Sequence, residues 1–277
     1  MRYRSSLRGA VLNVAMLIAM SSGAYAQQGD DLRQAAQNPV ADLISLPFQN
    51  NTNFNVGTLD NTQNVLNIQP VVPFSLNQDW NLITRTIMPV IYQPPFFEGD
   101  STDFGLGDLT PAFFLSPKKP IPIKPGVGLV WGAGPVFALP TSTDPRLGTE
   151  KWSAGPTFVA LLLTKKVVTG FLINSLWSYA GESDRADVNA MTLQPFFNYN
   201  LPKGWYLTTS PIITANWEAP SDERWTIPIG GGIGRVFKLG SQPIDAQVSY
   251  YYNVERPALT GGDSQLRAQS TFLFPTK

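Results

Sequence analysis

Residues 205–218 constrain the fold most strongly, because fourteen consecutive residues keep a period of two. One set of alternate positions is mostly apolar and is bounded by Trp205 and Trp217, whereas the other set is mostly polar. Successive side chains of a β-strand point to opposite faces, so the pattern predicts a strand with one apolar and one polar face. Strands of soluble proteins usually have about 5–6 residues, so this stretch is hard to place in a small sandwich.

The apolar face of this stretch has the height of a membrane. Trp205 and Trp217 lie twelve residues apart. At about 3.4 Å per residue the strand is ~40 Å long, which gives ~30 Å of height at a tilt of about 40–45°. This height matches the hydrocarbon core of a bilayer with an aromatic ring at each water boundary. The stretch therefore predicts a transmembrane strand of a closed β-barrel.

The first 26 residues are typical of an export signal. Three arginines precede a mostly apolar run at residues 10–20, and Ala24 and Ala26 form an A-x-A cleavage pattern. The alternative is an N-terminal membrane anchor, but the apolar run is short and ends in Ser21-Ser22-Gly23. We expect cleavage after Ala26 and export to the outer membrane of a Gram-negative cell.

Composition excludes several other classes of protein. Removal of the signal leaves 17 basic and 20 acidic residues, a formal charge of −3, which gives no electrostatic basis for binding nucleic acid. The remaining sequence has no apolar run near the roughly 18–20 residues that a membrane helix needs. The chain has no cysteine, which excludes a lipoprotein anchor and disulfides.

Twelve strand-like segments follow, and the even number is the one that single-chain bacterial barrels require. The segments are 42–56, 62–74, 79–93, 104–116, 126–140, 150–163, 167–180, 188–201, 204–218, 224–238, 244–255 and 264–274. Mostly tight turns alternate with longer loops, which predicts an antiparallel up-and-down β-barrel with short turns in the periplasm. We expect a signal peptide at 1–26, a periplasmic arm or short helix at 27–41 and the barrel at 42–277.

Prolines inside the segments argue against a regular barrel, because proline cannot donate a ladder hydrogen bond. They are Pro47, Pro70, Pro89, Pro111, Pro135, Pro156, Pro195, Pro211 and Pro228. Either the prolines lie at bulges, or the segments break and form a soluble sandwich. Their repeated placement within long segments favours bulges.

The types of residue present argue against an enzyme. The chain has no histidine, which removes Ser-His hydrolysis and, together with the missing cysteines, the common zinc ligands. The glycine run at residues 230–234 lacks the Lys-Ser/Thr of a phosphate loop and lies within a strand pattern, so it indicates close packing or bending. We expect no catalytic residues, no metal and no cofactor.

Two sets of residues are candidates for functional roles. Charged residues on the polar faces are candidates for lining the lumen: Arg85, Asp245, Glu255 and Arg267. The favoured interpretation is that these charges pair with each other and rigidify the interior, and Glu255 and Arg267 on neighbouring strands are such a candidate pair. Aromatic residues near strand ends are candidates for the girdles at the membrane boundaries: Trp80, Tyr92, Trp177, Trp205, Trp217 and Tyr252.

Four strings resemble the sequences of a bacterial outer-membrane family named for the meta-cleavage pathway of phenol degradation, whose members are often labelled transporters. They are residues 38–51, 63–70, 80–86 and 204–207. The resemblance extends over nearly all of the chain after the signal. It implies a barrel in the outer membrane but carries over no binding residues.

The sequence thus predicts a twelve-stranded outer-membrane channel or transporter for small molecules, with aromatic or other apolar compounds as candidate solutes. The alternative is a structural or adhesive barrel with a filled lumen. The expected partners are membrane lipid and lipopolysaccharide, the barrel-assembly machinery and a small-molecule solute. The sequence leaves open the oligomeric state and whether the lumen is open or plugged.

Overall fold

A computed structural model describes residues 28–275, so the expected signal peptide lies outside the described residues. The first described element is helix α2 at Gln28–Ala36. The strands of the first half are β1 (Ile44–Val56), β2 (Asn61–Ile68), β3 (Val71–Ser75), β4 (Trp80–Gln93), β5 (Asp103–Leu106), β6 (Thr110–Pro117), β7 (Ile121–Lys124) and β8 (Val127–Ala138). The second half contains β9 (Lys151–Thr164), β10 (Val167–Gly181), β11 (Asn189–Asn200), the 3-10 turn η1 (Pro202–Gly204), β12 (Trp205–Thr209), β13 (Ile213–Asn216), β14 (Trp225–Leu239), β15 (Gln242–Glu255) and β16 (Ser264–Phe274).

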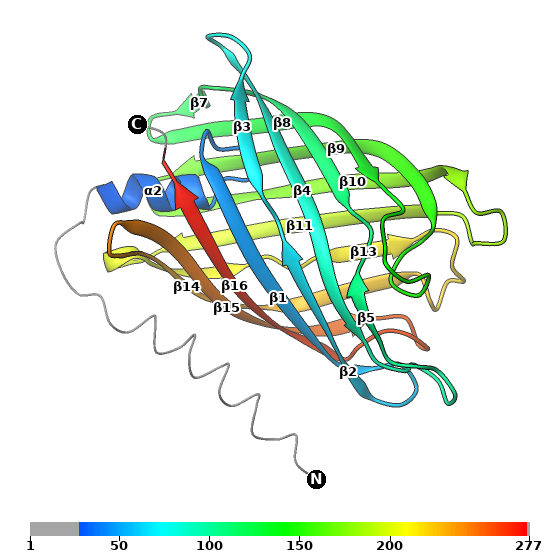
Figure 1. Cartoon of the computed structure of the whole chain (residues 1–277). Helices are drawn as coiled ribbons and strands as arrows, with labels where there is room; N and C mark the ends of the chain where they lie inside the picture. The colour runs from blue at the N-terminus through cyan, green and yellow to red at the C-terminus, as the bar shows by residue number, and fades with distance from the viewer. Residues whose placement is uncertain (1–27, 276–277) are drawn as a thin grey trace.

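The strands form one closed antiparallel barrel, because the first strand β1 pairs with the last strand β16 from Ile44 opposite Phe274 to Phe54 opposite Ser264 (Figure 1). Three barrel strands are interrupted, so that β2 continues into β3, β5 into β6 and β12 into β13. Short β7 pairs only with β8 and forms a hairpin at one end of the barrel. The described part of the chain therefore makes a barrel of twelve strands, as the sequence predicts.

The prolines lie at interruptions of the pairing, which explains how the barrel accommodates them. Pro70 separates β2 from β3, and Pro211 separates β12 from β13. Pro228 adjoins a bulge in the pairing of β14 with β15. Pro156 falls in a gap of the β9–β10 pairing, between Thr157 opposite Asn174 and Ala154 opposite Trp177. A residue without an N–H group loses nothing where the neighbouring ladder is already open.

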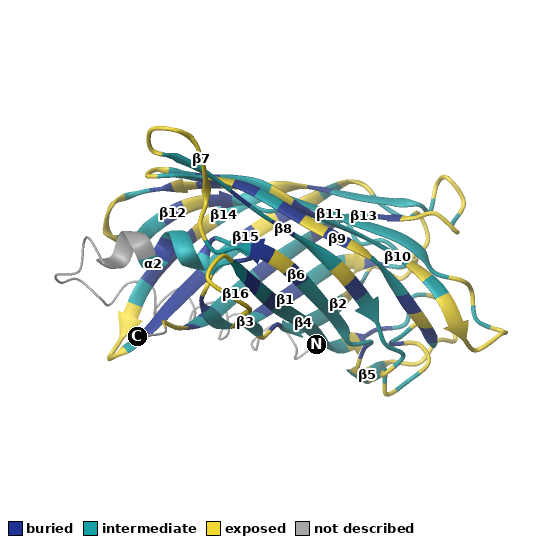
Figure 2. Ribbon diagram, turned by 90° about the horizontal axis from the view of Figure 1, so that it is seen from above, coloured by how far each residue is buried: buried dark blue, intermediate teal, exposed yellow. Residues whose placement is uncertain are grey.

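The two faces of the strands differ as the period of two predicts (Figure 2). On β10, the outward Phe171 and Trp177 are exposed, whereas the inward Val168 and Leu172 are buried. Inward apolar residues of β4, β6, β8, β9, β10 and β11 form one cluster that includes Ile83, Phe114 and Val159. The opposite inner wall, on β1, β15 and β16, carries mostly polar side chains such as Gln49, Gln247 and Gln269. The barrel interior therefore has an apolar side and a polar side.

The segment before β1 lies against the short-turn end of the barrel, which is the end with the turns around residues 165–166 and 201–204 (Figure 1). Arg33 donates to the carbonyl oxygen of Leu201 at 2.7 Å, and Gln34 donates to that of Thr164 at 2.9 Å. Val40 is buried within the apolar inner cluster. Of the two interpretations of the arm, the structure thus has a helix packed at the barrel mouth. Among the described residues, no helix is long and apolar enough to cross a membrane.

Candidate functional site

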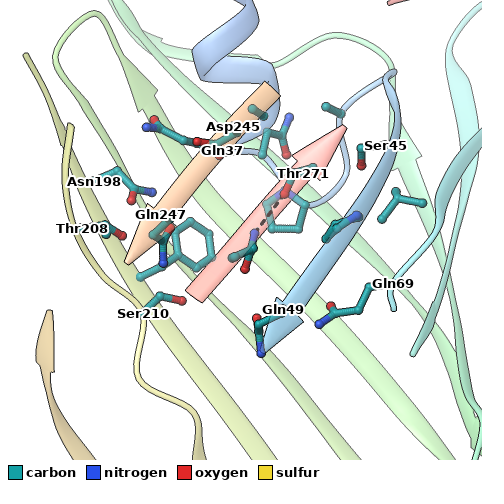
Figure 3. Close-up of a pocket in the computed structure, with 18 of the residues that line it drawn as sticks. Gln37, Ser45, Gln49, Gln69, Asn198, Thr208, Ser210, Asp245, Gln247 and Thr271 are labelled. Carbon is teal, nitrogen blue, oxygen red and sulfur yellow. Dashed lines mark hydrogen bonds between the residues drawn. The ribbon is translucent and has the colours of Figure 1, made fainter. Parts of the chain in front are cut away.

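A cavity inside the barrel lies next to the segment that leads from α2 into β1 (Figure 3). The cavity has a volume of about 160 Å³. Amide side chains dominate its polar lining, among them Gln37, Gln49, Gln69, Asn198 and Gln247 (Figure 3). These residues come from the turn after α2, β1, the β2–β3 junction, β11 and β15, so the closed barrel brings together residues that lie far apart in the chain.

Three of the four charged candidates line this cavity, namely Arg85 on β4, Asp245 on β15 and Arg267 on β16. The period of two on their strands places them on the inner face. The fourth candidate, Glu255, is exposed at the end of β15. The structure therefore brings two cations and one carboxylate to the same space.

The predicted ion pair between Glu255 and Arg267 does not form. Arg267 lies opposite Ser249, whereas Glu255 lies opposite Ile227 on the other neighbouring strand. The separation of six positions between Ser249 and Glu255 corresponds to roughly 20 Å along the strand. The expectation was wrong because the register depends on the loop at residues 256–263, whose conformation leaves Tyr252 opposite Ser264.

Arg267 instead reaches across the barrel interior to the interruption between β12 and β13. Its guanidinium donates to the carbonyl oxygen of Ser210 at 2.7 Å, to Asn51 at 3.1 Å and to Gln265 at 3.0 Å. It also lies over the ring of Tyr251, 4.8 Å from its centroid. The backbone N–H of Ser210 donates to the hydroxyl of that same tyrosine at 3.0 Å. Arg267 and Tyr251 thus satisfy backbone groups that the interrupted strand leaves without a ladder partner.

The glycine run of β14 makes room for these contacts. Gly230, Gly232 and Gly234 face inward, opposite Tyr251, Ser249 and Gln247 of β15. A Cβ atom at Gly234 would collide with the ring of Tyr206, which is 1% exposed. The absence of side chains here lets residues of β15 and β16 reach β12, which is the close packing that the sequence predicts for the run.

In the described chain, the carboxylate of Asp245 accepts one side-chain hydrogen bond. The Tyr206 hydroxyl donates to its carboxylate at 2.7 Å, and both residues are buried. Tyr206 belongs to the polar set of the opening stretch, so the alternation places its ring inside the barrel. The carboxylate is therefore held against the wall by a neutral donor and forms no ion pair with either arginine of the cavity in the described chain.

The aromatic candidates lie near the two ends of the strands, as their spacing predicts. Trp80 opens β4 and packs edge-on against Trp131, with ring centroids 5.9 Å apart. Trp205 opens β12, and the guanidinium of Arg235 lies 5.1 Å from its ring centroid. At the opposite end, Tyr92, Trp177, Trp217 and Tyr252 are exposed.

The loop between β8 and β9 folds against the inner face at the long-loop end of the barrel. Asp108 accepts hydrogen bonds from the backbone N–H groups of Thr141 and Ser142, both at 3.1 Å, and from that of Thr149 at 2.7 Å. Leu147 is 6% exposed and lies over the inward Gly105. This loop therefore packs onto the inner face at the long-loop end. The sequence does not predict this contact, because no local pattern marks Asp108 as a loop anchor.

A second loop is tied to the barrel by an ion pair. Lys151 at the start of β9 lies 3.2 Å from the carboxylate of Asp187 in the loop between β10 and β11. The hydrogen bond and the charge of Lys151, together with a hydrogen bond from Ser178, lower the pKa of Asp187 below its ordinary value. The charged form of the carboxylate is therefore the form that holds this loop.

Comparison with known proteins supports the fold and leaves the family open. No protein-family model matches the chain, and no curated protein matches it. An outer membrane channel from Pseudomonas putida F1 is similar with a TM-score of 0.66 at 15% identity, over 92% of this chain and 100% of that one. Outer membrane phospholipase A from Escherichia coli has a TM-score of 0.46 at 12% identity, covering 91% of this chain and 99% of that one. The CymD monoaromatic hydrocarbon channel has a TM-score of 0.45 at 10% identity, covering 92% and 95%. The chain has the fold of an outer-membrane β-barrel.

Proposed function

We propose that the protein is an outer-membrane channel for small molecules. The observation that carries the proposal is a polar cavity inside a closed barrel whose outward side chains are mostly apolar. A barrel with such an exterior buries its apolar face in lipid, and a polar cavity between its inner walls gives solutes part of a path across it. The similarity in fold to an outer membrane channel agrees with this interpretation.

The proposal places the short turns and α2 in the periplasm and the longer loops outside the cell. Trp80 and Trp205 then lie at the periplasmic boundary, and Trp177 and Trp217 at the outer boundary, where aromatic rings are enriched. Membrane lipid and lipopolysaccharide would contact the outer face. The barrel-assembly machinery would insert the exported chain.

Two elements regulate the proposed path. Residues 32–43 pack into the periplasmic mouth, and the loop anchored by Asp108 narrows the outer mouth. A channel narrowed at both ends favours small solutes. The apolar inner wall favours solutes with an aromatic or other apolar part over fully hydrophilic ones.

Fractionation and solute uptake test this function. The full-length protein should be recovered with the outer membrane and should migrate differently on gels before and after boiling, because a closed barrel resists unfolding by detergent. Liposomes that contain the purified protein should swell in small solutes faster than empty liposomes. Recovery as a soluble protein would contradict the membrane location, and equal swelling of both liposome preparations would contradict the channel.

A further inference from the structure

The two arginines of the cavity differ in how many of their guanidinium N–H groups donate hydrogen bonds to the protein. All three nitrogen atoms of the Arg267 guanidinium group donate to protein oxygens, and its side chain is 2% exposed. Its contacts join β16 to β1 and to the interruption of β12. Arg267 therefore has a structural task and little capacity for a further ligand.

Arg85 has one recorded hydrogen bond in the described chain, from Nη2 to Gln69 Oε1 at 2.6 Å. Its neighbours across the strands are Val71 and Ala112, which offer no side-chain acceptor. Arg85 forms no ion pair with any carboxylate of residues 28–275. A guanidinium carries five N–H donors, so most of those of Arg85 have no protein acceptor. A half-buried cation without a counter-ion is costly, and a bound anion would offset that cost.

Arg85 stands where the apolar wall meets the amide side chains. Val71 and Ala112 pack against the apolar cluster of the inner wall. Leu172 and Phe196 of that cluster line the same cavity as Arg85 and Gln69. The cavity therefore presents a cation and an amide to one part of a ligand and an apolar surface to another part.

We propose that this cavity binds an organic anion that joins a carboxylate to an apolar ring or chain. The planar guanidinium of Arg85 matches the geometry of a carboxylate and can donate two parallel hydrogen bonds to it. Gln69 orients the guanidinium, and Leu172 and Phe196 contact the apolar part. This inference rests on the proposed channel function and names its solute class.

Binding of benzoate and of neutral benzyl alcohol to the purified full-length protein in detergent tests the proposal, with isothermal titration calorimetry as the measurement. Benzoate should bind more tightly than benzyl alcohol. Arg85→Gln should weaken benzoate binding at least tenfold and leave benzyl alcohol unchanged, and Arg85→Lys should retain part of the preference because it keeps the charge. Lys119→Gln, which removes an exposed cation from a turn outside the cavity, should bind as the native protein does.

The heat-dependent gel shift of each variant shows whether its barrel is intact, and Arg85→Lys serves as the test if Arg85→Gln does not fold. The inference would be overturned if the native protein bound no benzoate or bound both ligands equally. It would also be overturned if a folded Arg85 variant bound benzoate as tightly as the native protein does. Ion conductance of the native protein without benzoate separates the two proposals. Conductance without benzoate binding contradicts this inference alone, whereas benzoate binding without conductance contradicts the channel alone.

Discussion

At the residue scale, the direction of each side chain decides whether it meets the barrel interior or its surroundings. Ile173 and Asn174 are adjacent near the middle of β10, and the alternation points the first outward and the second inward. Arg85 and Arg267 show that direction alone does not define a role. Both face the cavity, but only Arg267 has protein acceptors for every guanidinium nitrogen.

Arginine substitutions at the adjacent pair test the assignment of faces. Ile173→Arg places a charge near the middle of the lipid-facing surface and should cost about 2–4 kcal/mol of folding stability. Asn174→Arg places the same charge in the polar interior and should cost much less. The measurement is the free energy of unfolding of both variants in urea with lipid vesicles. Equal losses would mean that β10 is buried on both faces, as in a soluble core.

At the scale of elements, side-chain contacts stabilise the interrupted strands and hold the loops of the barrel. The breaks at Pro70 and Pro211 open the ladder, and Arg267 and Tyr251 close the second break from across the interior. The loops at the long-loop end are held by charged groups, with Asp108 anchoring one and the Lys151–Asp187 ion pair holding another. These contacts hold both loops against the long-loop end of the barrel.

The Lys151–Asp187 ion pair predicts a pH dependence of the loop at residues 182–188. A carboxylate whose pKa is lower in the folded than in the unfolded protein stabilises the folded loop above its unfolded pKa. That contribution falls as the pH drops through the folded pKa, because Asp187 becomes protonated and releases Lys151. Titration of the Asp187 carboxyl carbon by NMR should give a midpoint below the ordinary value, and Lys151→Gln should raise that midpoint. An unchanged midpoint in the variant would show that the ion pair is absent in solution.

Sequence alone predicted the twelve strands and which of their side chains point into the barrel, because both follow from a local period of two. It also placed Arg85, Asp245 and Arg267 on inner faces. It did not predict the partner of Arg267, because that contact depends on glycines of β14 that leave space between distant strands. It left open the position of residues 28–41, since a short polar helix has no local signal for the surface on which it packs.

At the scale of the whole molecule, a closed barrel surrounds a polar cavity, and the N-terminal segment packs into one end of that barrel. The N-terminal segment packs Val40 against Phe114 and Val159 of the apolar wall, and Leu32 against the buried Tyr206 and Leu273 on the other side. The segment thus bridges both inner walls at the short-turn end. The central claim is that this barrel conducts small solutes and that the N-terminal segment restricts the flow.

Single-channel conductance in planar bilayers tests that claim most directly. Val40→Asp places a carboxylate in the apolar inner cluster, where its desolvation is costly, and should expel the segment from the mouth. Asp42→Ala alters an exposed residue two positions away and serves as the matched control. We predict a small conductance for the native protein and for Asp42→Ala, and a conductance several times larger for Val40→Asp with its heat-dependent gel shift intact. Equal conductance in all three proteins, or none in any of them, would contradict the account.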